Sequence, residues 1–578
     1  MDEPIINAAK SGFTLRYKNK TLLSAIDPVS QAEKTVMELF PPDRLQEARQ
    51  DRTLYFCPSP LFGYGLETLL SHITQDSAVL CVETDEKLFS LSVAHISKNL
   101  LTHPRFVLTN KKSGEDLCVL IREKYGGRAF RRIEMLKLSG GWQLDTENYS
   151  AMQEIIRSSL AIDWSNAMTI VKLGRRFMYN VIENISLLGK AKPITDFYCT
   201  SKPVLVLGAG PSLDPLLDNL EKAGVFKISE KNSKAGERNF MLVCVDSCLT
   251  LLKERGIVPD LAVILESQYW NLRDFLGSRN TGIKAAIDLS SYPGSVALLG
   301  GPVYFFYTPW TPLRFFERFN AAGLLPLSLP PLGSVGLTAV ELSKKITNGT
   351  IITGGIDFSF TLDSLHARSS PAHLARLLSQ NRFTSLFNAD AIFRPGVFDT
   401  FSKSHIPVKS DPAMRMYRNL FENEFSGGRI KDITGSGLYL GLETISIEKA
   451  IEILTAEYPR QTIQSLQGDG KNPDDESEKM HLVHDFIKKE KALLLEIRSF
   501  LTGSSFEDTQ SCKEENFETL LDKADYLWSH FPDCAGREGK RPAANDMVFI
   551  KRVRAEIDAF IKRWEMAEKK SQAFFPVL

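Results

Sequence analysis

Lys202-Pro-Val-Leu-Val-Leu-Gly-Ala-Gly-Pro-Ser-Leu-Asp214 is the stretch of this chain that decides its fold. A short apolar run, Val204 to Leu207, leads into a glycine turn, and a helical pattern starts at Leu213. This order predicts a buried parallel strand, a tight turn and a helix N-terminus. Such a turn leaves backbone N–H groups unpaired in front of the positive end of the helix dipole, which favours a phosphate group. We therefore expect a nucleotide to contact the turn residues Gly208, Ala209, Gly210, Pro211 and Ser212. The alternative is a tight strand-to-helix connection without a ligand, since the third glycine of the dinucleotide fingerprint is absent.

Further apolar runs with polar ends follow this stretch. The predicted strand Met241 to Val245 ends at Asp246, and the run Leu261 to Leu265 ends at Glu266. Strands that alternate with helices predict a doubly wound parallel sheet, whose ligands bind beyond the carboxyl ends of the strands. The residues expected to meet the glycine turn at this edge are Asp246, Ser247, Glu266, Gly333, Ser334, Gly355 and Asp357.

A second Rossmann-like pattern lies near the N-terminus. The predicted strand Leu54 to Cys57 enters a Pro- and Gly-rich turn, and the strand Ala78 to Val82 ends in Glu83-Thr-Asp85. An acidic residue at that place is suited to bind the hydroxyl groups of a ribose. Because prolines replace the first glycine and stiffen the turn, a degenerate unit that binds no ligand is the alternative.

The length of 578 residues exceeds that of one ordinary domain. We expect an α/β protein of three parts: a Rossmann-like domain with a bridging helix at 1–190, a central doubly wound domain at 191–440, and a helical region at 441–578.

The composition indicates a protein of the cytoplasm. Lys and Arg number 70, as do Asp and Glu, so no overall field favours nucleic acid or an anionic membrane as a partner. No apolar stretch approaches the ~18 residues of a membrane span, and the N-terminus lacks the pattern of a signal peptide. The cysteines and histidines show no metal-binding spacing, and scattered cysteines are typical of a reducing compartment.

Several motifs occur in order in the central region: Gly208-x-Gly-Pro-Ser-Leu, Val258-Pro-Asp-Leu-Ala262, Gly333-Ser-Val, Gly354-Gly-Ile-Asp-Phe-Ser-Phe360 and His366-Ala-Arg-Ser-Ser-Pro-Ala-His373. On these motifs the chain resembles the motility-associated (motility accessory) factor family, within the superfamily of 6-hydroxymethylpterin diphosphokinase MptE-like proteins (DUF115). The central region is also similar to the bacterial CMP-sialic acid-dependent sialyltransferases. Two positions depart from the sialyltransferase pattern: Ala209 replaces the usual Asn, and Ser359 the usual Tyr.

The resemblance implies a glycosyltransferase that moves a nonulosonic (sialic-type) acid from a CMP donor to Ser or Thr of flagellin. Its partners would be flagellin and the CMP-nonulosonic acid. The first alternative, implied by the archaeal branch, is a 6-hydroxymethylpterin diphosphokinase that uses ATP and Mg²⁺. The second alternative is a non-catalytic flagellar assembly factor.

Sugar transfer needs a base near neutral pKa for the acceptor hydroxyl, and histidine is suited to this role. The candidates are His366 and His405, the latter in a segment that resembles the one carrying the sialyltransferase base. Asp357 is a third catalytic candidate, which either contacts a ligand or caps a turn. No cofactor is required, because CMP is a good leaving group. Under the kinase alternative, Asp246 and Glu266 would hold Mg²⁺.

Overall fold

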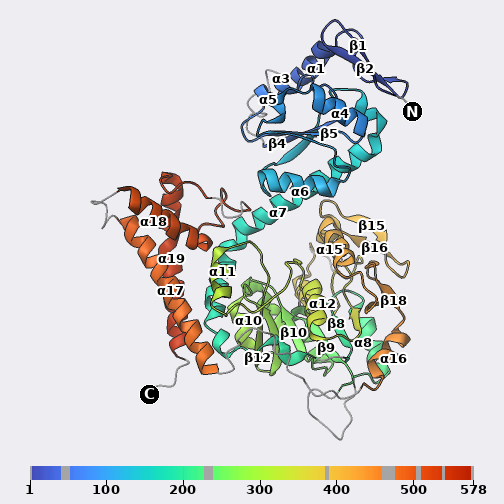
Figure 1. Ribbon diagram of the computed structural model, residues 1–578. Helices are drawn as coiled ribbons and strands as arrows, with labels where there is room; N and C mark the ends of the chain where they lie inside the picture. Colours follow the sequence, from blue (N-terminus) through green and yellow to red (C-terminus); the bar gives the residue numbers. More distant parts are fainter. Residues whose placement is uncertain are drawn as a thin grey trace. The chain divides into compact units, whose positions relative to one another are not determined.

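The computed structural model describes residues 3–40, 52–198, 201–226, 238–383, 389–458, 476–502, 510–536 and 541–573. By internal contacts the chain forms two compact units. The first contains residues 1–173 and 528–542, and the second contains residues 174–527 and 543–578. One long helix, α7 (Thr146–Ile185), runs through the boundary between them (Figure 1).

The first unit is Rossmann-like. Its four parallel strands stand in the order β6-β5-β4-β7, with bounds Phe106–Thr109, Ala78–Val82, Thr53–Pro58 and Arg132–Met135. Strands β4 and β5 are buried along their whole length, which agrees with their continuous apolar sequence. The connecting helices include α3 (Leu66–His72), α4 (Glu86–His95), α5 (Lys98–Leu101) and α6 (Gly114–Tyr125). A small antiparallel sheet, β1 (Ile5–Ala8), β2 (Phe13–Tyr17) and β3 (Lys20–Thr21), and helix α1 (Pro28–Met37) precede them.

The second unit contains a nine-stranded parallel sheet in the order β13-β12-β11-β10-β9-β8-β14-β17-β18. The strands, in the order of the chain, are β8 (Val204–Leu207), β9 (Met241–Val245), β10 (Leu261–Ile264), β11 (Ile283–Asp288), β12 (Gly300–Tyr307), β13 (Leu327–Ser328), β14 (Ile351–Gly354), β17 (Ile430–Ile433) and β18 (Glu443–Ile445). From β8 the chain builds outward to β13, then returns to place β14 on the other side of β8. The doubly wound α/β fold predicted from the sequence is confirmed, with its topological switch point between β8 and β14.

The helices around this sheet carry apolar residues at helical spacing. In α8 (Leu213–Lys222) the buried residues are Leu213, Leu216, Leu217 and Leu220. Helix α12 (Val335–Ile346) is buried over most of its length (Figure 1). The other helices are α9 (Leu249–Glu254), α10 (Pro293–Leu298), α11 (Arg314–Ala321), α13 (Pro371–Ser379), α14 (Ala389–Ile392), α15 (Pro412–Glu424) and α16 (Ile447–Thr455). A hairpin, β15 (Phe398–Phe401) and β16 (Pro407–Ser410), lies between α14 and α15 in the sequence.

The C-terminal helices pack against the sheet domain. They are α17 (Glu476–Thr502), α18 (Gln510–Lys523) and α19 (Met547–Gln572). The ring of Phe315 in α11 contacts the rings of Phe486 in α17 and Trp564 in α19. Arg318 in α11 also pairs with the buried Glu490 of α17, at 2.8 Å. The sequence predicted three parts, but these aromatic and ionic contacts join most of 441–578 to the central sheet in one compact unit.

Candidate functional site

Two glycine loops touch each other at the switch point. The N–H of Gly208 donates to Gly354 O at 2.9 Å, and that of Gly210 donates to Gly355 O at 2.8 Å. A Cβ atom on Gly355 would lie 2.1 Å from Gly208 O, and the φ angle of Gly355 is +72°. Only glycine therefore allows the ends of β8 and β14 to approach this closely.

Asp357 orders the glycine turn from the neighbouring loop. Its buried carboxylate accepts hydrogen bonds from Ser212 N at 2.7 Å and from Ser212 Oγ at 2.6 Å. Burial raises the pKa of Asp357, whereas the charge of Lys403 and the bonds from Ser212 lower it. The N–H groups of Gly208, Gly210 and Ser212 thus all have protein partners. The expectation that these N–H groups are unpaired is wrong, because the β14 loop occupies them.

A buried ion pair lies next to Asp357. The ammonium of Lys403 contacts the carboxylate of Asp432 at the end of β17, and the two side chains are 3% and 2% exposed. Thr353 Oγ1 donates to the second oxygen of Asp432 at 2.9 Å. Burial raises the pKa of Asp432, and Lys403 lowers it. No local pattern predicted this pair, because Lys403 belongs to the turn of the hairpin β15–β16 and meets Asp432 only in the folded chain.

The structure places one of the two candidate histidines at the glycine turn. Ala367 N, directly after His366, donates to the carbonyl of Ala209 at 2.9 Å. His366 is exposed to solvent, although many protein atoms lie near its ring. Desolvation, followed by the nearby charge of Arg273, therefore lowers the pKa of His366. Histidine is suited to accept a proton in catalysis, because its ordinary pKa lies near neutral pH.

The other candidate, His405, is exposed in the turn of the β15–β16 hairpin. It has a φ angle of +58°, which few residues other than glycine adopt, and its N–H donates to Ser402 O at 2.9 Å. His405 lies two residues after the buried Lys403, so its loop is anchored to the same polar cluster.

The two carboxylates at the ends of β9 and β10 have partners of their own. Asp246 accepts from Ser247 N at 2.8 Å and from Asn271 Nδ2 at 2.9 Å. Burial raises the pKa of Asp246 to about 7, against the effect of the Asn271 bond. Glu266 accepts from Gln268 N at 2.9 Å. In the described ranges, no three or more His, Cys, Asp and Glu side chains gather in a way that could hold a metal ion.

Helix α12 brings Gly333 and Ser334 to the same edge of the sheet. Ser334 is its N-cap residue, and the Ser334 side chain makes no capping hydrogen bond. Ile356 lies between this helix and the glycine turn: its side chain is 2.9 Å from a Cβ built on Gly208 and 3.7 Å from one on Gly336. The N-terminus of α12 therefore lies at this edge of the sheet without a side-chain cap.

Two asparagines that the sequence analysis missed hold the loops after β10 and β11. Asn180 Nδ2 donates to Ser267 O at 2.9 Å and to Ser290 O at 2.8 Å. One turn later in α7, Asn184 Nδ2 donates to Leu289 O and Ser291 O, both at 2.9 Å. The four-residue spacing of the asparagines on a predicted helix was the available signal, because it places both on one face.

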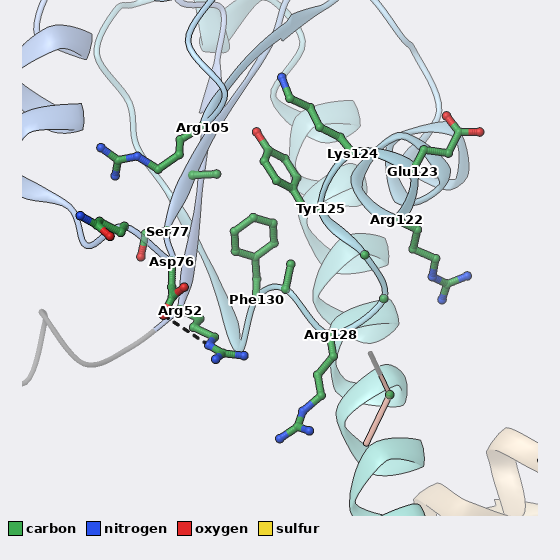
Figure 2. A pocket seen from close by; sticks show the side chains of 16 residues that line it. Arg52, Asp76, Ser77, Arg105, Arg122, Glu123, Lys124, Tyr125, Arg128 and Phe130 are labelled. Atoms are coloured by element: carbon green, nitrogen blue, oxygen red, sulfur yellow. Dashed lines mark ion pairs between the residues drawn. The ribbon is translucent and has the colours of Figure 1, made fainter. Parts of the chain in front are cut away.

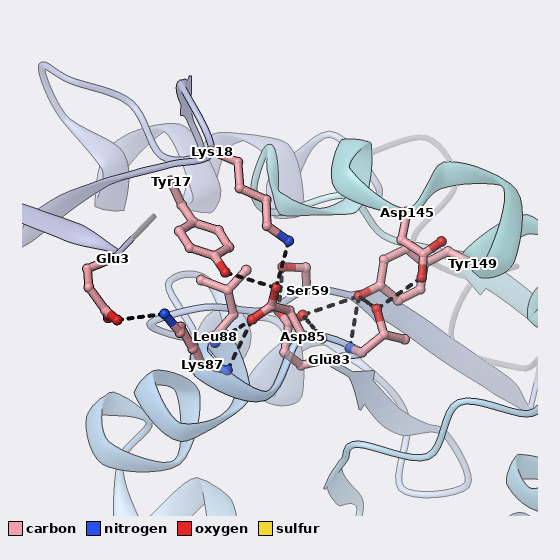
Figure 3. Close-up of polar contacts among 11 residues, drawn as sticks. Glu3, Tyr17, Lys18, Ser59, Glu83, Asp85, Lys87, Leu88, Asp145 and Tyr149 are labelled. Atoms are coloured by element: carbon pink, nitrogen blue, oxygen red, sulfur yellow. Dashed lines mark hydrogen bonds and ion pairs between the residues drawn. The ribbon is translucent and has the colours of Figure 1, made fainter. Parts of the chain in front are cut away.

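In the first unit, the chain itself fills the corresponding edge of the sheet (Figure 3). Glu83 is 1% exposed and accepts from Ser59 Oγ at 2.5 Å and from Asp85 N at 3.1 Å. Asp85 caps α4 and binds Lys18 at 3.0 Å. Both acidic side chains at the end of β5 therefore have partners within the chain, and the interpretation of a ribose-binding acid stays a prediction.

The fold and this edge define a doubly wound α/β protein with a Rossmann-like N-terminal unit. Residues 175–363 match the family model described as 6-hydroxymethylpterin diphosphokinase MptE-like. An uncharacterized protein of Treponema pallidum (strain Nichols) is 29% identical over 577 residues, which cover 97% of this chain and 94% of that protein. The structure of the Maf glycosyltransferase from Magnetospirillum magneticum AMB-1 is similar with a TM-score of 0.54 and 12% identity, covering 99% of this chain and 90% of that one.

These comparisons confirm the resemblance inferred from the sequence. Residues 175–363 are similar to the MptE-like family model, and the chain is similar in fold to the Maf glycosyltransferase. Across the described parts of the chain, every helix is too short or too polar to span a membrane.

Proposed function

We propose that this protein is a glycosyltransferase that moves a nonulosonic acid from a CMP donor to Ser or Thr of flagellin. The observation that carries the proposal is the position of His366 beside the glycine turn of the switch point, where Ala367 N bonds to Ala209 O, in a chain whose fold matches a Maf glycosyltransferase over 99% of its length. The proposal includes a cytoplasmic location and no required cofactor or metal. It also includes no nucleic acid or membrane partner.

The reaction requires few groups. The acceptor oxygen bonds to the anomeric carbon of the sugar, and the bond from that carbon to the phosphate oxygen breaks. CMP leaves with the electron pair, and a base takes the proton of the acceptor hydroxyl. His366 is the proposed base, because it lies beside the glycine turn and its lowered pKa disfavours the charged ring; His405 is the second candidate. Asp357 positions the turn through Ser212.

The proposed nucleotide site is the carboxyl edge between β14 and β10. The N-terminus of α12 at Gly333 and Ser334 would hold the phosphate, since Ser334 does not cap it. Gly208, Ala209, Gly210, Pro211, Ser212 and Gly355 would form the floor, and Asp246, Ser247 and Glu266 the side toward the nucleoside.

The test compares His366→Ala, His405→Ala and a control, His481→Ala, on the exposed surface of α17. The readouts are CMP release by the purified protein with a CMP-nonulosonic acid and flagellin, and the mass of flagellin from cells. We expect His366→Ala to abolish both while melting as the wild type does. Full activity of His366→Ala with loss in His405→Ala would move the base to His405. Retained activity in both variants would sink the histidine mechanism.

The description of the matching family model favours a second candidate, the diphosphokinase. A thermal-shift comparison of CMP with ATP plus Mg²⁺ separates the candidates, since a ligand at 100 times its Kd adds about 2.7 kcal/mol of stability. Stabilisation only by ATP with Mg²⁺ would favour the kinase. Stabilisation by neither nucleotide would favour the assembly factor.

A further inference from the structure

A cavity of about 490 Å³ lies in the first unit, at the amino ends of the parallel strands. Arg52 directly precedes β4, Ser77 precedes β5 and Arg105 precedes the start of β6, and all three line it. The last turn of α6 and the loop after it form the other wall (Figure 2). The cavity is therefore at the opposite edge of the sheet from Ser59 and Glu83, which follow the carboxyl ends of β4 and β5.

Basic side chains predominate among the lining residues. They are Arg52, Arg105, Arg122, Lys124 and Arg128, against the acidic Asp76 and Glu123. Asp163, outside the lining, pairs with Arg122 at 3.0 Å, and Asp76 lies 3.8 Å from Arg52. The lining keeps an excess of positive charge after these pairs are counted, although the chain as a whole has no net charge.

Two of the cations are held in place by carbonyl groups, which orient a charge without neutralising it. The guanidinium of Arg105 donates to Thr74 O at 2.7 Å and to Leu70 O at 3.0 Å. Lys124 Nζ donates to Phe106 O at 2.8 Å. Desolvation lowers the pKa of Lys124, so an anion in the cavity would stabilise its charged form.

The wall of the cavity contains an aromatic pair. The rings of Tyr125 and Phe130 stand edge to face at 5.1 Å and lie between the side chains of Arg105 and Arg128 in Figure 2. The buried hydroxyl of Tyr125 has no hydrogen-bond partner within the described part of the chain. A buried hydroxyl without a partner indicates a missing ligand atom or water at that place.

We propose that this cavity binds a small phosphate-bearing molecule, held by Arg52, Arg105 and Lys124. The volume lies within the roughly 300–1,000 Å³ that is usual for small-molecule sites. Arginine forks and a lysine ammonium are the groups that bind phosphate oxygens most strongly, through charge-assisted hydrogen bonds. The site belongs to the first unit alone and does not depend on the function proposed for the switch point of the second unit.

Calorimetric titration of the full chain with inorganic pyrophosphate tests this site. The variant is Arg52→Gln combined with Lys124→Gln, which leaves the Arg105 cap of α3 intact. The control is Arg157→Gln combined with Lys98→Gln, which changes the charge equally at exposed positions of the same unit outside the cavity. Arg52→Gln alone is the second variant if the double variant does not fold.

We expect the double variant to weaken pyrophosphate binding at least about tenfold, whereas the control keeps the wild-type affinity. Ser212→Ala, at the switch point, should also bind pyrophosphate normally, which separates this site from the proposed catalytic one. Absence of pyrophosphate binding, or equal affinity in the double variant and the control, would overturn the proposal. Equal binding of citrate and pyrophosphate would overturn the assignment to phosphate.

Discussion

Replacement of Glu83 by Gln should make the first unit more resistant to unfolding as the pH rises. Glu83 lies at the end of β5, where Ser59, Asp85 and Tyr149 surround its carboxylate (Figure 3). Burial raises the pKa of Glu83 to about 7, and the hydrogen bond from Ser59 opposes this increase. Glutamine has the same shape: its oxygen can accept from Asp85 N, and its NH₂ group can donate to Ser59 Oγ.

The size of the effect follows from the two pKa values. The pKa of Glu83 is 4.5 in an unfolded chain and about 7 in the folded protein. Between these values the folded state binds more protons, so its free energy of unfolding falls as the pH rises. The difference corresponds to about 3 kcal/mol at about 1.4 kcal/mol for each pH unit. This contribution is complete below pH 4.5 in the wild type and is lost above pH 7. Glutamine does not titrate, so the variant keeps this contribution to the free energy of unfolding across the whole pH range.

The assay is urea unfolding at a series of pH values between 4.5 and 8, followed by brief proteolysis that detects fragments of residues 1–173. The difference in unfolding free energy, variant minus wild type, should rise by about 3 kcal/mol across this range. Glu86→Gln is the matched control, because Glu86 is 84% exposed and lies three residues away. A difference that stays constant with pH, or that the control reproduces, would refute the reasoning.

Three further predictions concern the second unit. Lys403→Met should destabilise the second unit by about 3–5 kcal/mol in urea unfolding at pH 7, because two buried carboxylates lose their cation. Addition of Asp432→Asn should recover most of the loss. A cost of Lys403→Met under about 1 kcal/mol would contradict the buried pair. Gly355→Ala should cost about 2 kcal/mol or more in the same assay, because the added Cβ meets Gly208 O at 2.1 Å and φ is +72°. The control Gly427→Ala, whose Cβ meets nothing within 4 Å, should cost under about 1 kcal/mol, and equal costs would show that the two loops can separate freely. Asn184→Ala should leave Leu289 O and Ser291 O without their side-chain donor. Amide hydrogen exchange of residues 288–292 should then become about tenfold faster. Unchanged exchange would mean that α7 does not hold the loop after β11.

Local patterns were sufficient to predict the class of fold. Continuous apolar runs such as Val204 to Leu207 became fully buried parallel strands, and the leucine spacing after Leu213 became the buried face of α8. Gly208 and Gly210 were predicted to lie in a turn because only a few residue types favour such turns. These features depend on neighbours within a few residues, which is why they are visible in a sequence.

The side-chain and backbone partners at the site were not predictable from local patterns, because they come from residues far apart in the chain. Hydrogen-bond partners for the Gly208 turn come from the loop after β14, and the partner of Asp432 comes from a hairpin turn at Lys403. Sequence reasoning treats the N–H groups of a turn as free, because it has no information on which loop folds over them.

The sequence by itself determined the class of fold, the glycine turn at Gly208 and the switch-point edge as the expected place of the candidate site. The tertiary structure alone decided that the turn is internally bonded, that His366 rather than His405 lies against it, and that cations gather around the cavity near Arg105. The physical reason is that secondary structure follows from the period of apolar residues along the chain. Charge clusters and cavities instead follow from packing, which brings together residues that no local period connects.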